Sequence, residues 1–160
     1  MQKNTSLIRV LTILLLLVFN CLATENYLNI TADVIPRRIK QGEEGVLTLK
    51  ITPVNGIRIS SHPKFMIKLN PSDNLIFSKL FFTASELNFE TTAEDNTVYL
   101  NLEKKNEITF KVNDSALIGR INISGEVIFT AVFQDNWSLK THQSFNVGFL
   151  SMRNQKIKKK

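Results

Sequence analysis

Apolar residues recur at every second position through most of the chain, and this alternation restricts the fold more than any other feature. A period of two is that of a β-strand with one face in a core and the other toward solvent. The longest example covers residues 120–133, where Gly125 occupies the apolar phase and indicates a bulge or a close backbone approach. The apolar members of this stretch are Ile121, Ile123, Val127, Phe129, Ala131 and Phe133.

Shorter alternating stretches occur between turn-forming residues elsewhere in the chain. They cover residues 28–34, 47–51, 57–59, 65–69, 98–102, 108–112 and 145–149. No segment has a sustained helical period. Eight or nine such strands predict an all-β fold, an antiparallel β-sandwich of the immunoglobulin type. In the less regular middle we expect a poorly paired edge strand over 75–82, a long loop over 83–95 and a hairpin connection at 103–107.

Residues 1–23 have the features of a secretory signal peptide. Lys3 and Arg9 precede the apolar stretch 10–19, which is short for a membrane span because a spanning helix needs about 20 apolar residues. Export to the periplasm or cell envelope is therefore predicted.

The cleavage point has two interpretations. Cleavage after Ala23 would leave a mature chain that begins at Thr24. Alternatively, residues 18–21 form a lipobox, the signal is 1–20, and a lipidated Cys21 anchors the protein, for instance in the outer membrane. The remaining chain then divides into a β-sandwich domain over 24–152 and a basic disordered tail over 153–160.

Positive charge is concentrated at the two ends of the chain. There are 20 Lys and Arg against 14 Asp and Glu, a formal net charge of +6, but residues 24–152 hold 13 basic and 14 acidic residues. A nucleic-acid-binding domain carries its basic patch on the fold, so no nucleic-acid partner is expected. Attraction of the tail to anionic lipid is an alternative to a purely solvated tail. Otherwise we expect membrane contact only through a lipid at Cys21.

One cysteine and two histidines leave few routes to catalysis. Cys21 would be discarded or lipidated, so it supplies no nucleophile, disulfide or zinc ligand. Ser60 or Ser61 beside His62 could form a serine hydrolase, but neighbours on an extended chain point to opposite faces. His142 lacks any metal-ligand spacing. We therefore predict no catalytic residue, no metal and no cofactor.

Three segments, 42–51, 55–61 and 125–132, resemble the N-terminal periplasmic domain of the thiol–disulfide interchange protein DsbD. The resemblance extends over residues 27–149 and implies an immunoglobulin-like fold. It also implies two redox cysteines six positions apart, after the third segment. In this chain those positions hold Val132 and Ser138, and neither can form the thiolate that exchange requires. The resemblance thus implies a cysteine-free form of a redox module.

These observations predict a non-catalytic extracytoplasmic binding or adaptor domain with a protein partner. We expect its contact surface in the loop 134–142, where the resemblance places the active site of the family. Trp137 either caps the end of the sandwich or anchors the partner. A docking accessory in thiol–disulfide interchange is the alternative function, and a serine hydrolase is a second. The candidate contact residues are Asp135, Asn136, Trp137 and His142.

Overall fold

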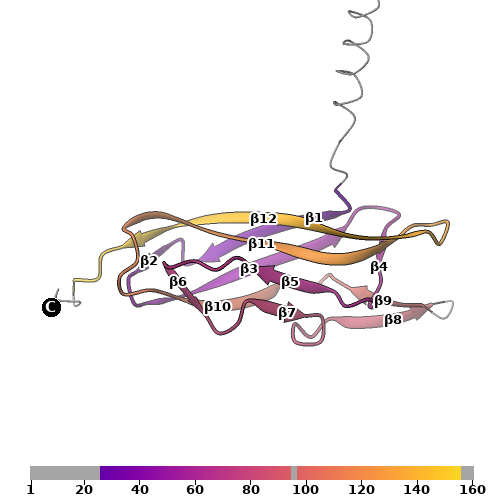
Figure 1. Cartoon of the computed structure of the whole chain (residues 1–160), viewed down its shortest axis with the longest axis horizontal. Helices are drawn as coiled ribbons and strands as arrows, with labels where there is room; N and C mark the ends of the chain where they lie inside the picture. The colour runs from indigo at the N-terminus through magenta and orange to yellow at the C-terminus, as the bar shows by residue number, and fades with distance from the viewer. Residues whose placement is uncertain (1–25, 95–96, 156–160) are drawn as a thin grey trace, which may run out of the picture.

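The computed structural model describes residues 26–94 and 97–155, which are built from β-strands (Figure 1). The candidate signal peptide, both cleavage points, Cys21 and the lysines of the tail lie outside the described residues. The strands are β1 (Leu28–Ile35), β2 (Arg38–Lys40), β3 (Glu44–Pro53), β4 (Arg58–Ile59), β5 (Met66–Leu69), β6 (Leu75–Phe77), β7 (Phe81–Thr83), β8 (Glu90–Glu94), β9 (Thr97–Asn101), β10 (Asn106–Val112), β11 (Gly119–Val132) and β12 (Ser138–Met152).

Two sheets make up the body of the domain. The first has the order β1-β3-β10-β6, and the second has the order β2-β12-β11-β5-β7, with β4 also paired to β11. Among the described strands every pair is antiparallel except β2 with β12, which is parallel. This architecture confirms the predicted immunoglobulin-like antiparallel sandwich. β8 and β9 form a separate hairpin.

The core lies between the sheets and consists mainly of the alternating apolar residues, with further members such as Ile39, Phe82 and Phe89 from outside the alternating stretches. Burial of a large aliphatic or aromatic side chain contributes about 1.5–3 kcal/mol, so a core of this size stabilises the domain without disulfides. The largest fully buried side chains are Phe65, Phe110, Phe129, Leu28, Ile39, Leu47, Leu49, Ile51, Ile59, Ile67, Leu69 and Val34.

Gly125 allows the second sheet to pack closely, as its place in the apolar phase of β11 indicates. A Cβ atom at this position would lie 2.4 Å from the carbonyl oxygen of Lys68 and 2.8 Å from the Phe145 ring. The register of β11 with β12 runs through Gly125 without interruption. The glycine therefore marks a close approach of backbone and ring rather than a bulge.

The predictions for the middle of the chain were partly wrong. The stretch 75–82 is not one edge strand, because β6 pairs with β10 in the first sheet and β7 pairs with β5 in the second. The predicted loop 83–95 contains β8, which pairs with β9. All five residues of β8 are exposed, so its sequence carries no alternation that could reveal a strand. Residues 103–107 are not a hairpin connection, since β9 and β10 belong to different sheets.

The strands run along the length of the molecule and define two ends (Figure 1). The β11–β12 turn, β4 and the β8–β9 hairpin lie at one end, whereas β2 and the last described residues lie at the other. Between them, Gln143 joins the two sheets at one edge. Its side-chain amide accepts a hydrogen bond from the Leu28 N–H at 3.1 Å and donates one to the Leu28 carbonyl at 2.5 Å.

Candidate functional site

The turn between β11 and β12 is a short, well-defined hairpin loop. The Phe133 N–H donates to the Trp137 carbonyl at 2.9 Å, and the Asn136 N–H donates to the Phe133 carbonyl at 3.0 Å. Asn136 has a φ of 61°, the left-handed conformation that asparagine tolerates better than most residues. This is the geometry of a three-residue hairpin loop closed by a left-handed residue.

The hairpin places Val132 opposite Ser138, the two positions that the DsbD resemblance singles out. Phe133 and Trp137 form the next pair toward the turn and are joined by the hydrogen bond from the Phe133 N–H to the Trp137 carbonyl. Hydrogen-bonded and non-hydrogen-bonded pairs alternate along an antiparallel ladder, so Val132 and Ser138 form a non-hydrogen-bonded pair. Side chains in such pairs are the closest that cross-strand neighbours can be.

Val132 and Ser138 both line a cleft of about 370 Å³ on the outer surface of the second sheet. We call this space the hairpin-end cleft. Its lining is Ser60, His62, Pro63, Thr97, Tyr99, Thr130, Val132, Asn136 and Ser138.

The β8–β9 hairpin forms one wall of the cleft and is fastened to the region of β4. Ser60 forms an isolated β-bridge with Tyr99, and the Ser61 N–H donates to the Val98 carbonyl at 2.9 Å. The Arg58 guanidinium lies 4.2 Å from the centre of the Tyr99 ring and forms an ion pair with Glu94. These contacts hold β9 against the sandwich, and β9 in turn carries the exposed strand β8.

Thr130 is the most unusual residue of the cleft. Thr130 is only 7% exposed, and its Oγ1 atom has no hydrogen-bond partner among the described residues. Thr130 lies in the polar phase of β11, so the sequence pattern alone would place it in solvent. The β8–β9 wall buries it instead. Sequence reasoning missed both Thr130 and Tyr99. Tyr99 lies in the stretch 98–102, which was predicted to be a strand, but its pairing with β8 was not predicted because residues 83–95 were assigned to a loop.

The structure corrects the prediction for Ser60, Ser61 and His62. The chain bends after β4 instead of staying extended, and the Ser61 Oγ lies 2.8 Å from His62 Nδ1. Ser60 does not reach the ring: its hydroxyl donates to the His62 carbonyl at 2.6 Å and accepts from the His62 N–H at 3.1 Å. Among the described residues no carboxylate forms an ion pair with the exposed imidazole of His62.

A second hollow of about 310 Å³ lies on the other side of His62. Its floor includes the apolar side chains of Phe65, Phe89 and Leu100, and Phe65 packs edge-on against Phe89 with ring centres 5.3 Å apart. His62 lines both this hollow and the hairpin-end cleft. The two spaces together offer polar groups on one side and apolar groups on the other.

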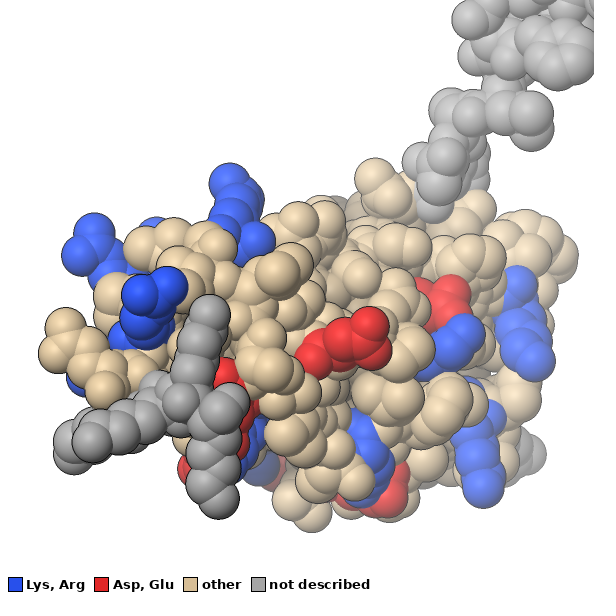
Figure 2. Space-filling view, turned by 60° about the vertical axis from the view of Figure 1, so that its left-hand side comes forward, with Lys and Arg blue, Asp and Glu red and all other residues tan. Residues whose placement is uncertain are grey.

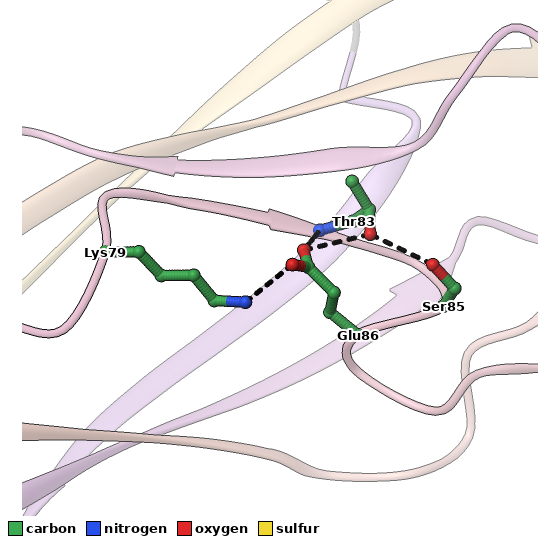
Figure 3. Close-up of polar contacts among 4 residues, drawn as sticks. All are labelled: Lys79, Thr83, Ser85 and Glu86. Carbon is green, nitrogen blue, oxygen red and sulfur yellow. Dashed lines mark hydrogen bonds and ion pairs between the residues drawn. The ribbon is translucent and has the colours of Figure 1, made fainter.

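The turn that borders the second hollow is tied by a network around Glu86 (Figure 3). The Glu86 carboxylate accepts hydrogen bonds from Lys79 Nζ at 2.7 Å, from the Thr83 N–H at 2.8 Å and from Thr83 Oγ1 at 2.9 Å. The Thr-x-x-Glu spacing is that of a capping box, in which the glutamate reaches back to the N–H three residues earlier. Ser85 joins through its contact with Thr83 at 3.1 Å.

The Glu86 network predicts a pH-dependent contribution to stability. The hydrogen bond from Lys79, followed by those from Thr83, lowers the pKa of Glu86 from 4.5 to about 2. A carboxyl with a depressed folded-state pKa stabilises the fold above its unfolded value and loses that effect as the pH falls toward its folded value. We expect Glu86→Gln to lower the urea midpoint at neutral pH and to have little effect once the pH is below 2. A difference of constant size across this range would contradict the prediction.

The four predicted contact residues do not converge on one site. Asn136 lines the hairpin-end cleft, and Asp135 lies in the turn, where its carboxylate accepts from the Trp137 N–H at 3.4 Å. Trp137 is 53% exposed and stacks on Phe133, which in turn packs edge-on against Tyr27. The indole therefore covers the end of the sandwich and is accessible at the same time. His142 lines a separate hollow with Glu126, Ile128, Lys140 and Thr141.

Residues 26–94 and 97–155 contain no group of three side chains that could hold a metal ion. In the same ranges, no helical segment has the length and hydrophobicity needed to cross a bilayer.

No family model matches this chain, and no curated protein matches it. Solved structures of similar architecture include a cohesin module of a family 33 glycoside hydrolase from Clostridium perfringens, with 8% identity and a TM-score of 0.43 over 81% of this chain and 100% of that one. The major pilin subunit BcpA of Bacillus cereus has 11% identity and a TM-score of 0.42 over 79% of this chain, which spans 40% of the pilin. A type I cohesin–dockerin complex from Clostridium thermocellum matches with 14% identity and a TM-score of 0.36, over 79% of this chain and 100% of that one.

Proposed function

We propose that the protein is a non-catalytic, extracytoplasmic binding module that receives a segment of a partner protein in the hairpin-end cleft. Thr130 is the observation that carries this proposal. A buried hydroxyl without a hydrogen-bond partner costs about 1–3 kcal/mol. Because this hydroxyl is buried, a bound chain would have to shift neighbouring side chains of the cleft lining before one of its polar groups could supply the missing bond. The cleft volume of about 370 Å³ lies within the range of small binding pockets.

The surroundings of the cleft favour a protein as the partner. The second hollow accepts apolar side chains, and the cleft itself offers hydroxyl groups and an asparagine amide. The Trp137 ring is held in place by Phe133 and leaves part of its surface free. Exposed, preorganised aromatic rings are common anchors in protein interfaces. A polypeptide carries both the apolar and the polar groups that such a surface would bind.

A Thr130→Val variant separates binding from folding. The two side chains have the same shape, so the unbound domain should keep or gain stability when the unpartnered hydroxyl is removed. Binding should weaken about fivefold to tenfold, the effect of one hydrogen bond of about 1–1.4 kcal/mol. Ser151→Ala is the matched control, because Ser151 also has a buried, unpartnered hydroxyl but does not line the cleft.

A photo-reactive amino acid at Asn136, on the cleft lining, would capture the partner in cells that produce the protein. The same group at Lys105, an exposed residue outside the cleft, gives the background. We expect a specific cross-linked species only at position 136, with a lower yield in Thr130→Val and an unchanged yield in Ser151→Ala. Equal capture at both positions, or no effect of Thr130→Val, would contradict the proposal.

The alternative function is a docking accessory in thiol–disulfide interchange. It is supported by the resemblance to DsbD together with the place of Val132 and Ser138, which face each other and line the cleft. Under this alternative the species cross-linked at Asn136 is a thioredoxin-like protein. Any other captured protein would favour the general binding module.

A further inference from the structure

The end of the domain opposite the hairpin-end cleft carries an exposed surface that is both basic and apolar. We define the basic end patch by Arg38, Arg120, Arg153, Leu117, Ile118 and Leu150. Figure 2, which brings this end forward, shows Lys and Arg side chains gathered on its upper left with no acidic side chain between them.

The strand register places the central residues of this patch next to one another. Leu150 on β12 pairs with Arg120 on β11 and with Arg38 on β2, so the leucine lies between two arginines. All three side chains are exposed on the outer face of the second sheet. Arg120 lies across Gly148, since a Cβ atom at Gly148 would come within 2.7 Å of its Nε. The glycine thus leaves room for the guanidinium to lie along the sheet.

The three arginines of the patch have no acidic partner among the described residues. Of the basic residues next to the patch in the sequence, Arg37 forms an ion pair with Asp33 and Lys40 forms one with Glu43. Within the part of the chain that the structure describes, Arg38, Arg120 and Arg153 form none. The body of the domain has slightly more acidic than basic residues, so the positive charge of the patch does not follow from the net charge of the body. Exposed charges act over about 8–10 Å at physiological salt, and the nearest surface therefore responds to the patch rather than to the net charge.

The apolar members of the patch are unusually exposed. Leu117 is 71% exposed, Ile118 is 54% exposed and Leu150 is 41% exposed. Ile118 directly precedes β11, whose first residue pairs with Ser151, so it lies one step from the arginine row. Aliphatic side chains next to basic groups are the combination that interfacial membrane-binding surfaces use. A nucleic-acid surface would instead offer aromatic rings for base stacking, and this patch has none.

We infer that the basic end patch binds the surface of a membrane rich in anionic lipid. The arginines would contact the phosphate headgroups, and Leu117, Ile118 and Leu150 would enter the region just below them. Lys156, Lys158, Lys159 and Lys160 follow in the sequence and add positive charge after Arg153. The inference is independent of a lipid at Cys21 and of the partner proposed for the hairpin-end cleft.

Vesicle co-sedimentation tests this inference on a chain from Thr24 to Lys160, which contains every described strand and core residue. We expect binding to vesicles with equal parts of phosphatidylglycerol and phosphatidylcholine, little binding to phosphatidylcholine alone, and a loss of binding at high salt. Each basic group near an anionic surface contributes about 1 kcal/mol, so Arg38→Gln with Arg120→Gln should lower the partition coefficient roughly 30-fold.

The matched control is Lys50→Gln with Lys105→Gln, which removes two exposed, unpaired charges elsewhere. It should leave the partition coefficient nearly unchanged, and all variants should keep the thermal midpoint of the parent. Equal losses in the two double variants would overturn the inference. It would also be overturned if binding depended only on the tail beyond Gln155, or if the patch bound a DNA oligonucleotide but not the anionic vesicles.

Discussion

Replacement of Val132 and Ser138 by cysteine should produce a disulfide that forms in air. The two residues form a non-hydrogen-bonded cross-strand pair, for which the Cα atoms lie about 4.5 Å apart. Disulfides span Cα separations of about 4.4–6.8 Å, so the bridge fits without movement of the backbone. The ring that it closes is short, and the chain-entropy relation gives a stabilisation of about 2 kcal/mol. The measurement is the urea midpoint of the oxidised against the reduced double variant, in a chain that begins at Thr24.

Val132→Cys with Lys140→Cys is the control for this bridge. Lys140 pairs with Thr130, so it stands diagonally from Val132 at about 7–8 Å, beyond disulfide reach. Free thiols should persist in this control and disappear in the first variant. Two reactive thiols in both variants would show that the register of the hairpin is wrong. Formation of the bridge would test the geometry of the cleft but would not by itself decide between the two proposed functions.

Phe110→Ala should cost the domain about 3–5 kcal/mol of unfolding free energy. The Phe110 ring is 2% exposed and contacts the rings of Phe77 and Phe149, with centres 5.7 Å and 5.5 Å apart. It also fills the space above Gly45, where a Cβ atom would lie 2.8 Å from it. Truncation removes these contacts and leaves a cavity between the sheets. Domains of this kind have a total stability of about 5–15 kcal/mol, so such a loss is a large part of the whole.

The same substitution on the surface provides the comparison. Phe81 on β7 is 52% exposed, and Phe81→Ala should change the unfolding free energy by about 0.5 kcal/mol or less. Equilibrium urea unfolding of the two variants measures both values. A similar loss for Phe81 and Phe110 would mean that the core is not where the structure places it.

The strands with one buried face could be predicted from the sequence because apolar and polar residues alternate along them. β3, β10 and the first two thirds of β11 show a buried residue at every second position, and Gly125 indicated a bulge or a close approach, of which the structure shows the close approach. β8 could not be recognised in this way, because a strand exposed on both faces has no periodic constraint on its side chains. The pattern of apolar residues over 75–82 also does not show that β6 and β7 belong to different sheets.

The prediction of the candidate site was limited in the same way, because pairing between distant segments cannot be read from local sequence. The sequence directed attention to the β11–β12 loop and to positions 132 and 138, and both positions line the cleft. It could not show that the β8–β9 hairpin closes over the outer face of β11 and buries Thr130. It also misjudged Ser61 and His62, since the expectation of opposite faces holds only for an extended chain and this segment bends.

By itself, then, the sequence determined that the chain forms strands, which residues of the alternating strands enter the core, and that thiol chemistry is absent at positions 132 and 138. These properties follow from residue type and from a period of two, which are local. The tertiary structure decided which strands are neighbours, how the β8–β9 hairpin turns a solvent-facing threonine into a buried unpaired hydroxyl, and how β2, β11 and β12 bring Arg38 and Arg120 to either side of Leu150. Those properties depend on contacts between segments far apart in the chain, and no local pattern records them.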